Sequence, residues 1–176
     1  MGIDVYLEWD NKTDEEEKAQ YVGFDVRSGD VGYLREAYHG GPYGTHILIQ
    51  EDWNVEGGVE VENSVLRSRM GIVAKAVIWR NYKLYYSNGD KPHGVVEIDK
   101  EGVPELLDSL KTIFSDMEQF NHPPEIEDIP LSDDEAFKLM QEHVEIAWSV
   151  KSFYDFVALH GVKERAGLNP KIIVSY

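Results

Sequence analysis

Residues 3–9 place apolar side chains at every second position, in the order Ile3, Val5, Leu7 and Trp9. This period of two predicts a β-strand with one face in the core. Alternation also predicts strands at residues 21–26 and 58–62, and a short run rich in β-branched residues predicts one at 46–50. Further strands are expected at residues 94–98 and 171–175.

Apolar residues three or four positions apart predict helices in most of the remaining chain. One helix follows Asn63 or Ser64 and ends near Asn88, and a second begins at Pro104. Capping boxes at residues 13–16 and 132–135 mark two further helix starts. Residues 132–160 contain neither proline nor glycine, so they form one long helix or two helices with a bend.

Strands dominate the first third of the sequence and helices the last two thirds. This segregation predicts an α+β fold, a small mixed or antiparallel sheet with helices packed on one face. The strands expected near residues 94–98 and 171–175 leave an α/β arrangement open. With 176 residues and no repeat or linker, residues 1–176 are expected to form a single globular domain.

The chain is strongly acidic, with 33 Asp and Glu against 17 Lys and Arg, a formal net charge of −16. The hydrophobic content of 42% argues against intrinsic disorder, which requires low hydrophobicity as well as high charge. The acidity argues against nucleic acid and against anionic membrane surfaces as partners. It suits a basic protein partner instead.

Cysteine is absent, which excludes disulfide frameworks, thiolate metal sites and thiol nucleophiles. The longest run without a formal charge is 14 residues, from Ala37 to Gln50, whereas a membrane helix needs about 20. The first residues lack the basic region of a signal peptide. We therefore expect a soluble cytoplasmic protein.

Residues 32–46 differ in composition from their surroundings, with four of the 15 glycines, three tyrosines and two histidines. Glycines let the backbone approach a ligand closely, and successive N–H groups can form an anion-binding nest. Arg35 could bind a carboxylate or phosphate through two hydrogen bonds. The candidate ligand-binding residues are Arg35, Glu36, His39, Gly40, Gly41, Tyr43 and His46.

The string Tyr33-Leu-Arg-Glu-Ala-Tyr-His-Gly-Gly-Pro-Tyr43 and the start Met-Gly-Ile-Asp-Val-Tyr resemble a group of small uncharacterised bacterial proteins. The resemblance implies a bacterial cytoplasmic protein. It implies no activity.

A purely structural interpretation of the same segment is open, because Gly-Gly-Pro-Tyr-Gly makes an ordinary tight connection. Arg35 would then pair internally, with Glu36, Asp30 or Asp4. The glycine spacing matches neither a Walker A loop nor a dinucleotide-binding fingerprint. Glu36, His39 and His46, with Asp4 or Glu8, carry atoms that bind metals, but the chain has no His-Glu-x-x-His pair, and we expect no metal and no cofactor.

Two functional hypotheses follow. The first is a binding or interaction module with an acidic surface, for a basic protein or a small anionic ligand, with a homo-oligomer also open. The second is a small hydrolase-like or metal-assisted enzyme using Arg35, Glu36, His39 and His46, although no Gly-x-Ser-x-Gly nucleophile motif is present. Convergence of these four side chains in one concave pocket would favour the enzyme.

Overall fold

A computed structural model describes residues 2–21, 29–37, 43–85, 102–118 and 129–175. Three strands form its sheet, β1 (Gly2–Glu8), β2 (Tyr33–Ala37) and β3 (Lys171–Ser175). The α-helices are α1 (Asp14–Tyr21), α2 (Gly44–Leu48), α3 (Asn63–Tyr85), α4 (Val103–Glu118), α5 (Asp133–Glu142) and α6 (Val144–Arg165). A short 3-10 helix, η1, covers Gly29–Val31. The predicted α+β class is confirmed.

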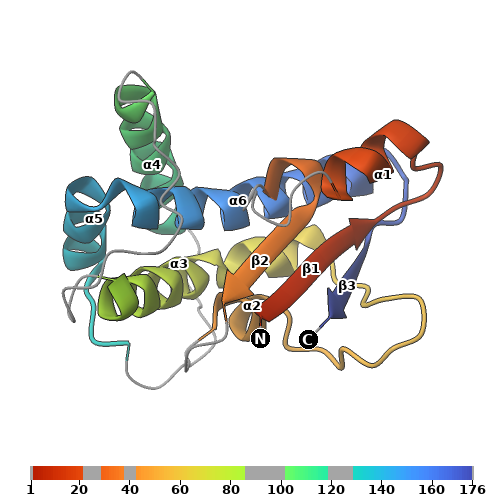
Figure 1. Ribbon diagram of the computed structural model, residues 1–176, viewed down its shortest axis with the longest axis horizontal. Helices are drawn as coiled ribbons and strands as arrows, with labels where there is room; N and C mark the ends of the chain where they lie inside the picture. The colour runs from red at the N-terminus through yellow and green to blue at the C-terminus, as the bar shows by residue number, and fades with distance from the viewer. Residues whose placement is uncertain (1, 22–28, 38–42, 86–101, 119–128, 176) are drawn as a thin grey trace.

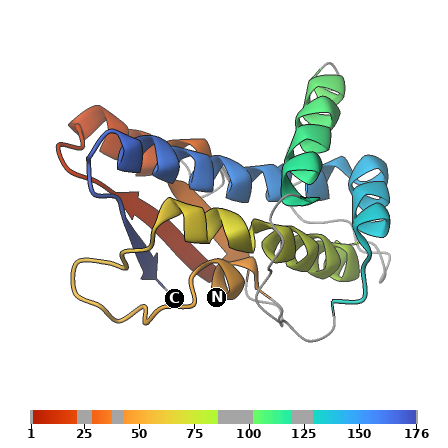
Figure 2. The ribbon, with the colours of Figure 1, turned by 180° about the vertical axis from the view of Figure 1, so that it is seen from behind.

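The sheet is antiparallel throughout, with strand order β2-β1-β3. The strand predicted at residues 3–9 is therefore the central one, and its inward residues Ile3, Val5 and Leu7 are buried. The sheet lies in front of α3 and α6 in Figure 1, and these two helices lie in front of the sheet when seen from behind in Figure 2. The inner face of the sheet is thus the one that the helices cover.

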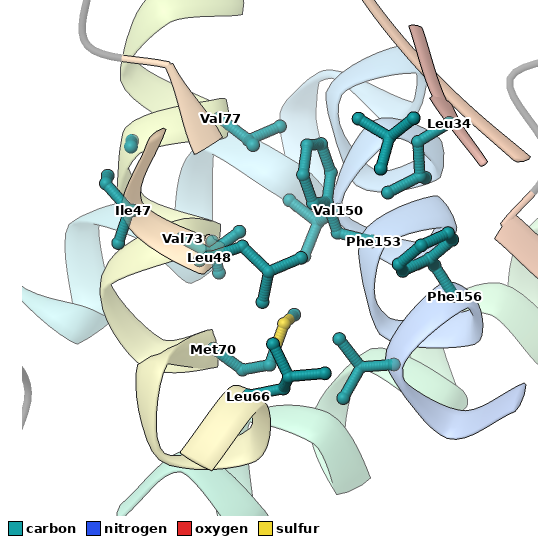
Figure 3. Close-up of a cluster of buried hydrophobic side chains, with 14 of the residues drawn as sticks. Leu34, Ile47, Leu48, Leu66, Met70, Val73, Val77, Val150, Phe153 and Phe156 are labelled. Atoms are coloured by element: carbon teal, nitrogen blue, oxygen red, sulfur yellow. The ribbon is translucent and has the colours of Figure 1, made fainter. Parts of the chain in front are cut away.

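The core lies where α3 and α6 meet the inner face of the sheet (Figure 3). Both helices present large apolar residues to it at helical spacing, which is why the sequence predicts them. The labelled core residues are Leu66, Met70, Val73 and Val77 from α3, Val150, Phe153 and Phe156 from α6, Ile47 and Leu48 from α2, and Leu34 from β2.

Helix α3 carries five basic residues and no acidic one, in a chain with a net charge of −16. Three of these cations form ion pairs with acids from three different segments. The pairs are Arg69 with Glu51 (2.9 Å), Lys75 with Asp133 (2.6 Å) and Arg80 with Glu36 (3.1 Å). Helix α3 therefore holds the segment after α2, the start of α5 and strand β2 by charge as well as by apolar packing.

Both predicted capping boxes are confirmed. The Ser132 side chain accepts from the Glu135 backbone N–H, and the Glu135 side chain accepts from the Ser132 backbone. Thr13 and Glu16 exchange the same two bonds at the start of α1. Residues 132–160 form two helices rather than one, because His143 leaves the helical conformation at φ −131° and ψ 86°.

The strand predicted at residues 46–50 is wrong, since Gly44–Leu48 is the short helix α2. A brief apolar run has no clear period and fits either structure. The strand predicted at residues 58–62 is reduced to one bridge between Val59 and Ile172. Tyr21 belongs to α1, and the strands predicted at 22–26 and 94–98 lie outside the described residues.

Helices α3 and α6 are 23 and 22 residues long. Neither they nor any other helix in the described ranges combines the length and apolar composition needed to cross a bilayer.

Candidate functional site

Strand β2 places the first two candidate residues, Arg35 and Glu36, on opposite faces of the sheet. Successive side chains of a strand point to opposite faces, so Leu34 and Glu36 lie on the inner face with their partners Val5 and Ile3. Arg35 lies on the outer face, opposite Asp4.

The Glu36 carboxylate is 1% exposed and is surrounded by donors. It accepts from the Gly44 N–H at 2.7 Å, from the Thr45 N–H at 2.9 Å and from the Thr45 hydroxyl at 2.7 Å. The Arg80 guanidinium lies 3.1 Å from it. Since Tyr43 makes no side-chain cap at the start of α2, the Glu36 carboxylate caps that helix from β2.

Tyr43 and His46 lie at the two ends of a row of rings. Tyr43 is buried, and the Arg80 guanidinium lies 5.4 Å from the centre of its ring. His46 is exposed, with its ring centre 5.5 Å from that of Tyr43 and 4.7 Å from that of Trp53. Tyr43 therefore serves packing, and His46 is the only one of the pair that reaches solvent.

Arg35 pairs with Asp4, one of the internal partners expected from the sequence. Its Nε lies 3.5 Å from the Asp4 carboxylate, while its side chain stays 39% exposed. The Tyr33 hydroxyl donates to the same Asp4 oxygen at 2.8 Å. Burial and this hydrogen bond raise the pKa of Tyr33, so the phenol keeps its proton and remains a donor.

Sequence reasoning missed the tyrosines around this pair. The Tyr6 ring centre lies 5.1 Å from that of Tyr33 and 5.7 Å from that of Tyr21. Burial and the Asp4 charge raise the pKa of Tyr6 as well. The signal was present in the outward positions of the first strand, where Tyr6 stands between Asp4 and Glu8.

A small hollow lies beside β2, between α3 and α6. It is lined by Leu34, Arg35, Val77, Arg80, Ser149, Ser152 and Phe153. Both serine hydroxyls donate to carbonyls of their own helix, at 3.2 Å and 2.9 Å. The hollow has room for about one water molecule, which is too little for a substrate.

The remaining candidates, His39, Gly40 and Gly41, lie outside the described residues. Within the described ranges, no three His, Asp or Glu side chains are grouped so that they could hold a metal ion. Of the described candidates, Arg35 lines the small hollow beside β2, whereas Glu36 and His46 do not.

A further polar feature is the acidic loop, residues 51–62, which extends away from the helices in both ribbon views (Figures 1 and 2). Its five charged residues are all acidic, Glu51, Asp52, Glu56, Glu60 and Glu62. Its first part is fixed by the bond from Trp53 Nε1 to the Ile49 carbonyl at 2.9 Å, and its last part by the bond from the Val59 N–H to the Ile172 carbonyl at 2.8 Å.

Between these anchors the acidic loop turns at Gly57 and Gly58, with φ values of +84° and +97° that favour glycine. The Gly58 N–H donates to the Val55 carbonyl at 3.1 Å and closes the turn. Val55 is 50% exposed at this turn, beside exposed Glu56. The acidic loop thus presents one apolar side chain among carboxylates.

Comparison of the chain with protein-family models, with curated proteins and with solved structures found no match. The resemblance of residues 33–43 to small bacterial proteins stays a prediction, and function has to be inferred from the residues described above.

Proposed function

We propose that this protein is an interaction module that binds a partner with a basic surface. The observation that carries the proposal is the unbalanced charge. Each ion pair consumes one acid and one base, so 17 bases leave 16 of the 33 acids without a one-to-one partner in the chain. A basic partner would neutralise part of this excess.

The acidic loop is the contact site that the geometry favours. Two of its acids are tied to the protein itself, Glu51 to Arg69 and Glu60 to Lys171 at 3.0 Å. Asp52, Glu56 and Glu62 are exposed. Because the loop is already ordered by its own bonds, binding would cost less conformational entropy than ordering a flexible segment.

The chemistry of the loop defines the kind of partner. Exposed carboxylates steer a basic surface into contact and reject acidic ones, while apolar burial supplies affinity. We therefore expect Lys or Arg side chains around a small apolar socket that receives Val55. Such a complex weakens as salt is added, because its charges lie near the solvent.

The geometry gives less support to an enzyme built on Arg35, Glu36, His39 and His46. The Glu36 carboxylate already accepts from the start of α2 and pairs with Arg80. A carboxylate with these bonds is poorly placed to take a proton from a substrate.

The test compares two charge-reversal variants of equal net charge. Asp52→Lys/Glu56→Lys alters the acidic loop, and Asp108→Lys/Glu142→Lys alters exposed acids on α4 and α5. A partner is captured by cross-linking in an extract of cells that make the protein, then purified, and its affinity is measured for each variant. We expect the loop variant to bind about tenfold or more weakly, whereas the matched variant stays close to wild type. Equal loss in both variants, or capture of no partner with a basic surface, would refute the proposal.

A further inference from the structure

Helix α6 carries two exposed apolar side chains on the side that faces away from the core. The described residues include four large hydrophobic side chains that are exposed, and two of them are Trp148 (37%) and Val162 (50%) on α6. They are almost four turns apart at about 3.6 residues per turn, so they lie on the same side of the helix. The positions between them on that side are Lys151, Asp155 and Leu159, which are half-buried, and Leu159 packs partly against the core. We call the five residues the α6 stripe.

The stripe lies opposite the buried side of the helix. Val150, Phe153 and Val157 are buried in the core, about half a turn around from the stripe. A helix on the surface of a single domain is usually polar on its outer side. In α6 that side consists of apolar residues on either side of one ion pair, between Lys151 and Asp155.

Charge distinguishes α6 from the other surface helices. Helices α1, α4 and α5 each contain four acidic residues and one basic residue. Helix α6 contains three of each. A basic partner would therefore be attracted to α1, α4 and α5, whereas a second copy of this acidic chain would meet less repulsion at α6 than at those three helices.

We propose that the α6 stripe is a docking surface for a second copy of the chain, with the two α6 helices antiparallel across a two-fold axis at Asp155. In this arrangement Trp148 packs against Val162 of the second copy, and the reverse contact forms at the other end, as an isologous interface requires. Lys151 and Asp155 are already paired within each chain. The axis brings the two Asp155 carboxylates together, and Lys151 of the same chain offsets the charge of each. This proposal does not depend on the proposed function.

The dimer should be weak and should respond to salt in a distinctive direction. One helix stripe buries less than the roughly 1,600 Å² of a standard interface. The charge of −16 on each copy opposes association, and salt screens that repulsion. Added salt should therefore strengthen the dimer, whereas it should weaken binding of a basic partner.

Sedimentation equilibrium of the full chain tests the proposal, from about 1 µM to about 200 µM protein, the range in which weak dimers assemble. Runs at about 50 mM and about 500 mM NaCl vary the screening length several-fold. We expect the average mass to rise toward that of two chains, and to rise further in high salt.

Two valine variants provide a matched pair, because Val162 and Val55 are both 50% exposed. Val162→Lys should remain monomeric, while Val55→Lys should dimerise at least as well as wild type, since both changes reduce the net negative charge equally. Trp148→Ser serves as a second stripe variant if Val162→Lys loses its circular dichroism. A wild-type chain that stays monomeric throughout, or stripe variants that dimerise like wild type, would overturn the proposal. Dissociation by Val55→Lys would also overturn it, since the interface would then include the acidic loop.

Discussion

Glu36→Gln removes the charge from a carboxylate that is 1% exposed and that receives four donor contacts. Glutamine keeps one acceptor oxygen and replaces the other with an NH₂ group, which would face the backbone N–H groups of α2 or the Arg80 guanidinium. Arg80 would then remain buried without its carboxylate. Breaking a buried pair in this way costs about 3–5 kcal/mol.

That loss should be easy to measure. In a chain of this size 1 kcal/mol shifts the melting temperature by about 2–4 °C, so the variant should melt about 6–20 °C below wild type. Thermal and urea unfolding followed by circular dichroism give both quantities. The matched control is Glu60→Gln, because the Glu60 side chain is exposed and its pair with Lys171 should contribute about 1 kcal/mol or less.

A second variant shows whether the cost comes from breaking the pair between Glu36 and Arg80. Glu36→Gln/Arg80→Met should destabilise less than the sum of the two single variants, because either single change already breaks the pair. The assignment of Glu36 as the cap of α2 and partner of Arg80 would be wrong if Glu36→Gln melted within a degree or two of wild type.

Other consequences can be checked by the same unfolding measurements. Arg35→Ala should cost about 1 kcal/mol or less, because its pair with Asp4 is partly exposed; a loss of 3 kcal/mol would contradict this. Val5→Asp should cost several kcal/mol, on the order of a buried unpaired charge, and a neutral effect would contradict the register of β1. Asn81→Leu should raise the stability, because neither polar atom of this buried amide has a hydrogen-bond partner among the described residues; a loss would show that the amide has one. Burial lowers the pKa of His160 below its ordinary 6.5, so the unfolded chain binds a proton first and stability should fall as the pH drops below about 6.5. His160→Gln should remove that part of the pH dependence, and an unchanged profile would contradict the assignment.

The sequence alone predicts an element correctly where the local pattern of that element agrees with its tertiary contacts. The register of β1 follows from four apolar residues at alternate positions, since a slip by one residue would turn all of them to solvent. The start of α5 follows from Ser132 and Glu135, which satisfy each other within one turn. Neither conclusion needs information from the rest of the chain.

Strand β2 and helix α2 escaped prediction for one shared reason. Glu36 is an inward position of β2, and a buried acid breaks the alternation by which a strand is detected. Its carboxylate in turn provides the cap that α2 lacks in its own sequence. The buried acid is tolerated because Arg80, far along the chain on α3, lies against it. The local sequence therefore suggested Glu36 as a site residue without revealing its bonds to α2 and its pair with Arg80.

The net charge of −16 likewise does not show where on the protein the excess acidic residues lie. Acids that meet α3, including Glu51 of the acidic loop, are turned toward its cations. Asp52, Glu56 and Glu62 of the same loop are exposed, and the acids of α6 are balanced by bases on that helix. Screening should act on these regions in opposite directions, because it weakens attraction between unlike surfaces and relieves repulsion between like ones. A basic partner on the acidic loop and a second copy on α6 are therefore separable by one salt titration. If both associations weakened together as salt rose, the second copy would be held by charge rather than by the apolar residues of α6.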